Sequence, residues 1–326
     1  MNPALQRLWQ RAGAALRRAF QPGDDDDPAT DTQMVAGEFT HQGRSTDYWL
    51  YVPPGQPRRP RPLVLMLHGC LQNPLDFAAG TRMNRHARQQ DVMVLYAGQN
   101  ERANPHRCWN WYKPQHQHRG RGEPGLLVAL VSDVITRFEA DPTRVYVAGL
   151  SAGGAMADVL GQAHPDLFAA VGVHAGLASG AALTVMSAIA VMQNGPSTPL
   201  SMALSGTSRM RVPTIVFQGD ADTTVHPRNA ERLVLAALGG DESEMQESTG
   251  TAPGGRGFRR RRYAARAASR ADLEFWLVLD AGHAWSGGSA EGSFTDPTGP
   301  DASAEMLRFF LAHPAPARRG DYASVG

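Results

Sequence analysis

The sequence has few thiols and almost no lysine. Among its 326 residues, Cys70 and Cys108 are the only cysteines, and Lys113 is the only lysine. Two thiols exclude a disulfide-dense scaffold and a four-cysteine zinc site, although one bridge can form. The 32 basic and 31 acidic residues leave a net charge of +1, so we expect no nucleic-acid partner.

Long apolar runs are also missing. No stretch reaches the ~18 consecutive apolar residues of a membrane-spanning helix, so the sequence predicts no membrane span. Residues 1–20 carry four arginines and lack the apolar core of a signal peptide. Their apolar residues recur every three or four positions, which predicts an amphipathic helix that docks on the domain or frays. Weak association of this helix with a membrane surface is the alternative.

Between the two ends, short apolar segments alternate with helical patterns. This alternation predicts an α/β fold with a doubly wound, mostly parallel sheet of about eight strands and flanking helices. We divide the chain into an amphipathic and acidic segment (1–34), one catalytic domain (35–314) and a tail (315–326). Residues 242–257 are predicted as a polar loop, and residues 178–210 as an insertion that could cap a site. The expected strands are 35–40, 46–52, 63–67, 92–96, 145–148, 169–173, 214–217, 259–265 and 273–279, and the expected helices are 76–90, 126–138, 152–163, 229–238 and 302–313.

A serine motif marks the end of the predicted strand at 145–148. In Gly149-Leu150-Ser151-Ala152-Gly153, a serine stands between two glycines and a helix follows. This strand–turn–helix context is that of a nucleophile elbow, where only small neighbours fit and the serine hydroxyl is lifted clear of the sheet. The pattern predicts Ser151 as a catalytic nucleophile.

A nucleophilic serine needs a base and an orienting acid, and in this architecture they follow it in the order acid, then histidine. Asp222 comes after the strand at 214–217, and His283 comes after the strand at 273–279. We predict that Asp222 is the acid and His283 the base. Asp220 is the alternative acid, with a role in shaping the turn as the simpler interpretation. His226 is interpreted as a wall residue, and His174 could point into the site.

The oxyanion of an acyl transfer needs two backbone donors. One should be the N–H of Ala152, directly after the serine. The other should come from the loop after the strand at 63–67, where Gly69 lets the backbone turn inward. We therefore predict that the N–H of Cys70 is the second donor.

These motifs together resemble the polyhydroxybutyrate depolymerase family of esterases over residues 35–313. The resemblance implies an α/β-hydrolase fold and serine carboxylester hydrolysis without a cofactor, and it supports Ser151, Asp222 and His283. Feruloyl and acetylxylan esterases are related to the same family. Gln218 departs from the family, because many relatives carry a histidine there, and no separate polymer-binding domain is visible. The motifs are Leu67-His68-Gly69-Cys70, Cys108-Trp109-Asn110-Trp111-Tyr112, residues 149–154, His283-Ala284-Trp285-Ser286-Gly287-Gly288 and Phe294-Thr295-Asp296-Pro297.

Aromatic residues on the same loops are the candidates for substrate contact. We predict this role for Trp109, Trp111, Tyr112 and Trp285, with core packing as the alternative. No metal site is expected, because the histidines at 116 and 118 have no carboxylate or thiolate cluster beside them.

The two cysteines are predicted to form a disulfide. Cys70 and Cys108 follow neighbouring strands, and their Cα atoms can therefore approach the ~5.5 Å that a bridge requires. Two free thiols are the alternative in a reducing compartment. The family resemblance favours export and the bridge, whereas the missing signal favours the cytoplasm, and the sequence leaves the compartment open.

The function that these features predict is hydrolysis of short-chain or hydroxyalkanoate esters through an acyl-enzyme on Ser151. The partner is thus an ester or polyester substrate. Feruloyl or acetylxylan esterase activity is one alternative, and acyl transfer to an alcohol on the same triad is another. A binding protein that keeps the fold without the chemistry is the third.

Overall fold

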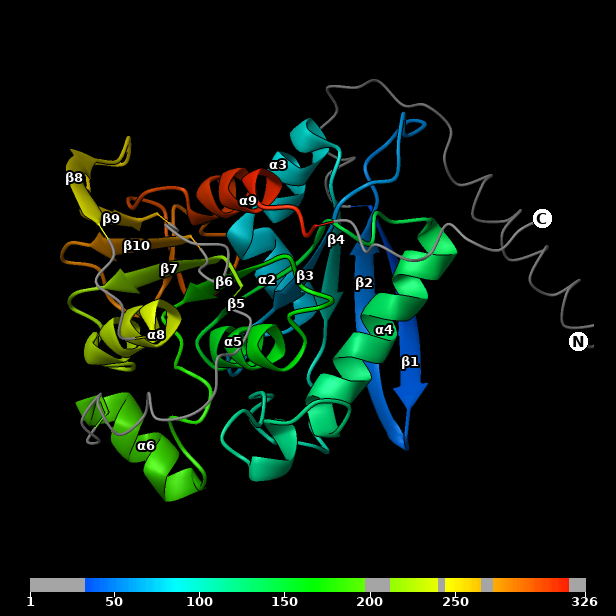
Figure 1. Ribbon diagram of the computed structural model, residues 1–326, viewed down its shortest axis with the longest axis horizontal. Helices are drawn as coiled ribbons and strands as arrows, with labels where there is room; N and C mark the ends of the chain where they lie inside the picture. Colours follow the sequence, from blue (N-terminus) through cyan, green and yellow to red (C-terminus); the bar gives the residue numbers. More distant parts are fainter. Residues whose placement is uncertain (1–32, 197–211, 240–243, 265–271, 317–326) are drawn as a thin grey trace, which may run out of the picture.

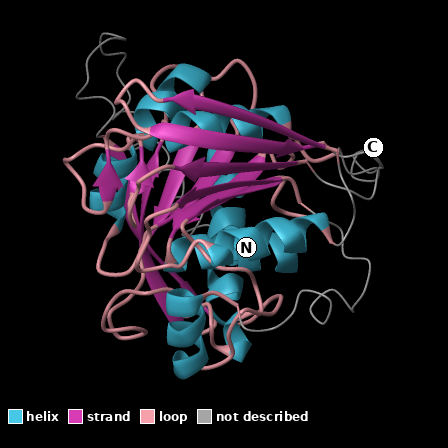
Figure 2. Cartoon of the chain, turned by 90° about the vertical axis from the view of Figure 1, so that its left-hand side faces the viewer, coloured by secondary structure: helices cyan, strands magenta, loops and turns pink. Residues whose placement is uncertain are grey.

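The computed structural model describes residues 33–196, 212–239, 244–264 and 272–316, which form a large twisted sheet between two layers of helices (Figures 1 and 2). The ten strands lie in the order β1-β2-β4-β3-β5-β6-β7-β10-β9-β8. The six from β4 to β10 pair in parallel, and two antiparallel strands extend each end. The predicted mostly parallel, doubly wound sheet is confirmed, with ten strands in place of about eight. The chain has the α/β-hydrolase fold.

The strand bounds are β1 Met34–His41, β2 Arg44–Tyr51, β3 Leu63–Leu67, β4 Met93–Ala97, β5 Val145–Leu150, β6 Ala170–His174, β7 Thr214–Gly219, β8 Met245–Thr251, β9 Gly257–Tyr263 and β10 Leu273–Val278, with the short pair β11 Trp285–Ser286 and β12 Thr295–Asp296. The helix bounds are α2 Pro74–Thr81, α3 Met83–Gln90, α4 Gly122–Phe138, α5 Ala152–Ala163, α6 Val185–Asn194, α8 Arg228–Leu238 and α9 Ala302–Ala312, with a 3-10 turn, η2, at Pro114–His116.

The apolar central strands build one hydrophobic core on each face of the sheet. Side chains of a strand alternate between the faces, so Leu65 of β3 belongs to the core that includes residues of α4, α5, α6 and α8. Val64 belongs to the other core, which includes residues of α2, α3 and α9. Both residues are fully buried. A strand covered on both sides needs an unbroken apolar run, and this is why β3 carries five apolar residues in succession.

The predicted helix 76–90 is wrong in one respect, because the structure divides it into α2 and α3. Arg82 between them has a φ of 53°, in the left-handed region, and it is both the last cap of α2 and the first cap of α3. Its guanidinium donates a hydrogen bond to the carbonyl of Gly287. The break between α2 and α3 therefore coincides with a hydrogen bond to the loop at Gly287, which is far away in the sequence.

The predicted polar loop at 242–257 is also wrong over part of its length, since β8 occupies Met245–Thr251. This edge strand pairs antiparallel with β9, and its side chains are mostly exposed on both faces. Glu247 of β8 forms an ion pair of 2.6 Å with Arg261 of β9. A strand whose two faces are both exposed to solvent shows no alternation of polar and apolar residues, so its sequence resembles that of a loop.

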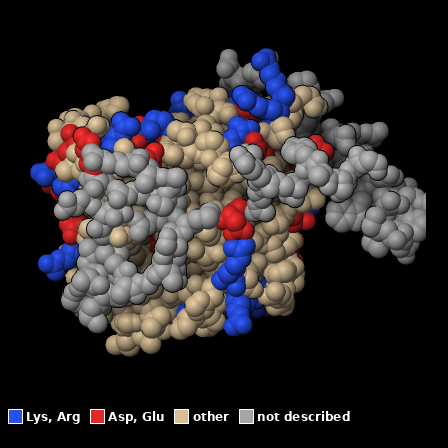
Figure 3. All heavy atoms as spheres, in the orientation of Figure 1, with Lys and Arg blue, Asp and Glu red and all other residues tan. Residues whose placement is uncertain are grey.

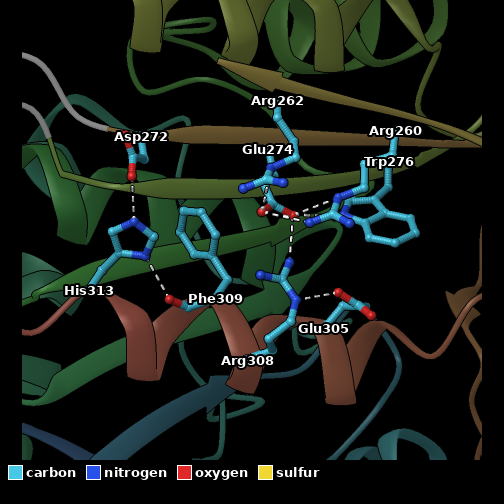
Figure 4. Close-up of polar contacts among 9 residues, drawn as sticks. All are labelled: Arg260, Arg262, Asp272, Glu274, Trp276, Glu305, Arg308, Phe309 and His313. Atoms are coloured by element: carbon cyan, nitrogen blue, oxygen red, sulfur yellow. Dashed lines mark hydrogen bonds and ion pairs between the residues drawn. The ribbon is translucent and has the colours of Figure 1, made fainter. Parts of the chain in front are cut away.

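A buried carboxylate on β10 ties three elements together (Figure 4). Glu274 accepts hydrogen bonds from Arg260 of β9 at 3.0 and 3.1 Å and from Arg308 of α9 at 2.6 Å. The guanidinium of Arg260 also stacks 4.9 Å above the ring of Trp276. Burial opposes the charge of Glu274, but the two arginines outweigh burial and hold the pKa of this carboxyl below its ordinary value.

The ends of the chain are described only in part. The predicted N-terminal helix, and with it the predicted surface association, lies outside the described residues. Ala315, placed in the tail by the sequence, still donates a backbone hydrogen bond of 2.8 Å to the carbonyl of Thr143. Within the described ranges, no helix has the length and apolar character to cross a membrane. On the face in Figure 3, charged side chains of both signs are interspersed among larger uncharged areas.

Candidate active site

Ser151 lies in a sharp turn between β5 and α5. Its φ of 57° and ψ of −120° are strained for a residue with a side chain. A Cβ on Gly153 would collide with the carbonyl of Leu67, and one on Gly149 would collide with Gly153. The backbone N–H of Ser151 donates a hydrogen bond of 2.9 Å to the carbonyl of His174 on the next strand. The two glycines of the motif thus give the turn the room that it needs, as the elbow pattern predicts.

An acid and a histidine meet at the same edge of the sheet as this turn, in the loops after the carboxyl ends of β7 and β10. Nδ1 of His283 lies 2.8 Å from Oδ2 of Asp222. The backbone N–H groups of Thr224 and Val225 donate to the other oxygen, Oδ1, at 2.8 Å each. Burial opposes the charge of Asp222, but these hydrogen bonds outweigh it and hold its pKa below the ordinary value. The carboxylate therefore stays charged and can orient the imidazole through an Nδ1–H donor.

Gln218 of β7 is a partner of the acid that sequence reasoning missed. It is fully buried, and its side-chain nitrogen donates at 3.1 Å to Oδ2 of Asp222 and at 3.1 Å to the carbonyl of Val225. Oδ2 of Asp222 thus contacts both the imidazole of His283 and the side-chain amide of Gln218. The sequence marked Gln218 as a departure from the resembled family and as a polar residue in a largely apolar strand, but not as a partner of the acid.

The other candidate acid and histidines occupy different places. Asp220 accepts a hydrogen bond of 2.6 Å from the backbone N–H of Asp280, which links two loops in the turn-shaping role. His226 accepts from the N–H of Arg228 at 3.2 Å, and it is not among the pocket residues described below.

His174 lies directly beneath the candidate site. Its ring stacks on Phe217 and on Trp285, with centroids 5.6 and 5.0 Å away, and Nε2 accepts the N–H of Ser286 at 3.0 Å. Complete burial, with a smaller contribution from the nearby His283, lowers its pKa to about 3. His174 is therefore neutral at physiological pH, and it supports the loop that carries His283.

The loop after β3 and the start of α5 each carry one of the predicted oxyanion donors. Within the part of the chain that the structure describes, the backbone N–H groups of Cys70 and Ala152 have no acceptor. Ala152 is the first residue of α5, where an N–H has no partner inside the helix. Cys70 is held by the predicted disulfide to Cys108, which is present with a Cα–Cα distance of 4.3 Å. The adjacent N–H of Leu71 donates at 2.8 Å to the carbonyl of His106. Two unpaired donors thus lie close to Ser151.

A small cavity opens at Ser151. Its volume is about 130 Å³ and its walls are almost entirely apolar. Its lining includes the disulfide between Cys70 and Cys108 together with Trp111 and Tyr112. These two aromatic residues therefore lie where the predicted substrate contact requires them.

Five further lining residues were not assigned individually from the sequence, which predicts only that the insertion at 178–210 could cap a site. They are Leu177 and four residues of α6, namely Val185, Ala188, Ile189 and Met192. Helix α6 belongs to the predicted insertion at 178–210, whose remaining residues from 197 lie outside the described chain. The three- and four-residue spacing of these positions was the available signal.

Trp109 and Trp285 lie in the core. Each is 1% exposed, and neither lines the cavity. Trp109 packs 5.8 Å from the ring of His68, and Nε1 of Trp285 donates at 3.1 Å to the hydroxyl of Ser303. The burial of both rings favours the alternative interpretation, core packing, over substrate contact.

Among the described residues, no hydrogen bond joins the Ser151 hydroxyl to His283. Such bonds are often long before substrate binds.

The structure also bears on the metal-site question that the histidines at 116 and 118 raise. His116 is buried, and it accepts a hydrogen bond of 2.9 Å from the N–H of Glu123. Within the described ranges, no three His, Cys, Asp or Glu side chains converge as a metal site.

Comparison with known proteins agrees with this geometry. The family model "Esterase PHB depolymerase" matches residues 46–253. The chain is 33% identical over 191 residues to poly(3-hydroxyalkanoate) depolymerase C of Paucimonas lemoignei, covering 56% of this chain and 46% of that protein. It is 37% identical over 196 residues to poly(3-hydroxybutyrate) depolymerase of Ralstonia pickettii, covering 53% and 39%. The matched part thus spans less than half of either depolymerase.

Among solved structures, an acetyl xylan esterase from Aspergillus awamori superposes with a TM-score of 0.62 at 20% sequence identity, covering 77% of this chain and 93% of that one. At this identity the likeness concerns the fold. The family match covers most of the described domain and includes both Ser151 and Asp222. The chain belongs to the Esterase PHB depolymerase family.

Proposed function

We propose that the protein is a serine carboxylester hydrolase that works through an acyl-enzyme. The observation that carries this proposal is the convergence, at one end of the sheet, of a strained serine turn, two unpaired N–H donors and a buried carboxylate–imidazole pair. Each of these parts answers one requirement of acyl transfer: a nucleophile, stabilisation of the oxyanion and a base of fixed orientation.

In the proposed acylation step, Nε2 of His283 takes the proton of the Ser151 hydroxyl as the oxygen attacks the ester carbonyl. The N–H groups of Cys70 and Ala152 stabilise the negative charge that develops on the carbonyl oxygen. The tetrahedral intermediate then collapses, the carbon–oxygen bond to the alcohol breaks, and His283 gives its proton to the departing alcohol.

Deacylation repeats the sequence with water. His283 removes a proton from the water, the resulting hydroxide attacks the acyl carbon, and the proton returns to Ser151 as the acid leaves. Asp222 remains charged throughout and stabilises the imidazolium that forms in each half-reaction. An acyl acceptor other than water would make the protein an acyltransferase, so product analysis with added alcohol separates the two activities.

Hydrolysis of p-nitrophenyl butyrate by the wild type and by Ser151→Ala tests the proposal. We expect the variant to lose activity by a factor of roughly 10⁴ or more while it keeps its melting temperature. Ser132→Ala on an exposed face of α4 is the matched control and should keep full activity. Mass spectrometry of acid-quenched wild type should detect one butyryl group, absent from Ser151→Ala. Equal activity in both serine variants would refute the proposal.

A further inference from the structure

The cavity at Ser151 has a defined position relative to the reacting atoms. Its walls include Cys70 and Ala152, which carry the two N–H donors, but no residue of the loop that holds His283. A departing alcohol must receive its proton from His283, so the alcohol of a bound ester has to lie on the His283 side. The carbonyl oxygen has to point to the N–H donors. The third substituent of the carbonyl carbon, the acyl chain, is then the group that faces the cavity.

We propose that this cavity is the acyl subsite, that helix α6 is its specificity wall, and that it selects short unsubstituted acyl chains over 3-hydroxyacyl chains. This inference rests on the proposed ester hydrolysis at Ser151 and adds the chemical class of the acyl group.

The volume of the cavity limits the length of the chain. An engineered apolar cavity of about 150 Å³ in another protein binds benzene, which has six heavy atoms. The cavity of about 130 Å³ therefore has room for a chain of roughly five heavy atoms. Acyl groups from acetyl to butyryl fit within it, whereas an octanoyl chain has to leave it through the mouth.

The apolar walls argue against a hydroxyl on the acyl chain. The disulfide, Trp111, Leu177, Ala188 and Met192 present carbon and sulfur to the cavity. A hydroxyl placed among them would lose its hydrogen bonds to water and gain no partner. An apolar pocket discriminates against an added hydroxyl by a factor of about 10 to 100.

Helix α6 is firmly attached where it forms the wall. A reciprocal capping box between Thr184 and Ser187 closes its first turn. At its other end, the side-chain amide of Asn229 donates at 2.8 Å to the carbonyl of Val191, and the N–H of His226 donates at 2.8 Å to the carbonyl of Met192. Both partners lie in or just before α8, close to the loop of Asp222. The wall is thus fixed to the same part of the fold as the acid.

The same helix offers both a probe of the cavity and a matched control. Ala188 is 4% exposed and faces the cavity, whereas Ala190, two positions later, is exposed and does not line it. Replacing Ala188 by phenylalanine fills the subsite. Replacing Ala190 by phenylalanine adds the same side chain to the same helix on the solvent side.

The test measures kcat/KM for p-nitrophenyl acetate, butyrate, octanoate and 3-hydroxybutyrate, which share one leaving group. For the wild type we expect butyrate to exceed both octanoate and 3-hydroxybutyrate by roughly tenfold or more. In Ala188→Phe, the ratio of butyrate to acetate should fall by at least about tenfold, as for the loss of room for one or two methylenes. Ala190→Phe should keep the wild-type ratios, and Met192→Ala, which enlarges the cavity, should raise octanoate relative to butyrate.

Three results would overturn the inference. The first is an unchanged ratio of kcat/KM between acyl chains in both Ala188→Phe and Met192→Ala. The second is a wild type that prefers 3-hydroxybutyrate to butyrate, and the third is a change in kcat/KM that appears only among alkyl butyrates that differ in the alcohol. If Ala188→Phe does not fold, Met192→Ala decides alone. Failure of the proposed function itself looks different, because hydrolysis would then persist in Ser151→Ala, whatever the acyl ratios.

Discussion

Removal of the disulfide should separate its effect on stability from its effect on catalysis. The bridge joins Cys70 and Cys108, which are 38 positions apart. In the chain-entropy model, a loop of this length makes the unfolded state less favourable by about 4 kcal/mol at 25 °C. A folded domain of roughly 280 residues has an unfolding entropy near 0.6 kcal/mol/K. The double variant Cys70→Ala/Cys108→Ala should therefore melt roughly 7 °C below the wild type.

The effect on catalysis follows from the position of the bridge. Cys70 supplies a proposed oxyanion donor, and Trp111 and Tyr112 follow Cys108 by a few residues on the cavity wall. Two hydrogen bonds between the same segments remain without the bridge. The N–H of Leu71 donates to the carbonyl of His106 at 2.8 Å, and the guanidinium of Arg107 donates to the carbonyl of Leu71 at 3.0 Å. We therefore expect a partial loss, with kcat lower by up to about 10² and KM changed less.

Urea unfolding followed by fluorescence, together with kcat on p-nitrophenyl butyrate, measures both effects. The wild type treated with a thiol reductant is the control, and it should match the double variant in both measurements. Thiol titration of the denatured, unreduced protein should find no reactive thiol. Two reactive thiols, or identical unfolding midpoints for the wild type and the double variant, would refute the reasoning.

Three other perturbations have defined outcomes. Asp222→Asn should lower kcat on p-nitrophenyl butyrate by about 10⁴, since an amide does not fix the required imidazole tautomer. Asp220→Asn should keep most of the activity, and the reverse order of the two variants would assign the role of the acid to Asp220. Trp285→Ala should lower the free energy of unfolding in a urea titration by about 3–5 kcal/mol, because the ring is buried, and should leave the ranking of esters unchanged. Wild-type stability with a changed ranking of esters would instead indicate substrate contact. Burial raises the pKa of Asp158 from 3.8 to about 6, so the folded state keeps this proton to higher pH than the unfolded chain does, and stability should fall as the pH rises through that window. The free energy of unfolding should fall by about 3 kcal/mol over this pH range, and Asp158→Asn should abolish the fall. Parallel curves of stability against pH for the wild type and Asp158→Asn would contradict this prediction.

The parts of the site that could be predicted from the sequence are those set by local backbone geometry and chain order. The turn around Ser151 tolerates only glycine at 149 and 153, and this requirement is written in five consecutive residues. Asp222 and His283 were identified because each follows a strand whose apolar run is unmistakable. Their hydrogen bond of 2.8 Å is consistent with that prediction, and kinetics of the variants will test their roles.

The parts that could not be predicted depend on tertiary contacts. The sequence predicts residues 178–210 only as an insertion that could cap a site, and not that α6 forms there or that Ala188 and Met192 line the cavity at Ser151. Nor does anything near Gln218 in the chain reveal that its amide would meet Asp222, since the contact depends on how the loop after β7 folds back. Likewise, β8 is a strand only because β9 lies beside it.

The buried carboxylate on β10 has a consequence for protein engineering. Helix α9 supplies Arg308 to Glu274, and it also buries Met306, Phe309 and Phe310 against the sheet. A chain shortened before α9 would lack these side chains, expose the apolar face of the sheet that they cover, and leave an acidic group in the interior with one fewer cation. Such a truncation should aggregate on expression. Tags and fusion partners therefore belong beyond Ala315, where they leave this helix and its ion pairs undisturbed.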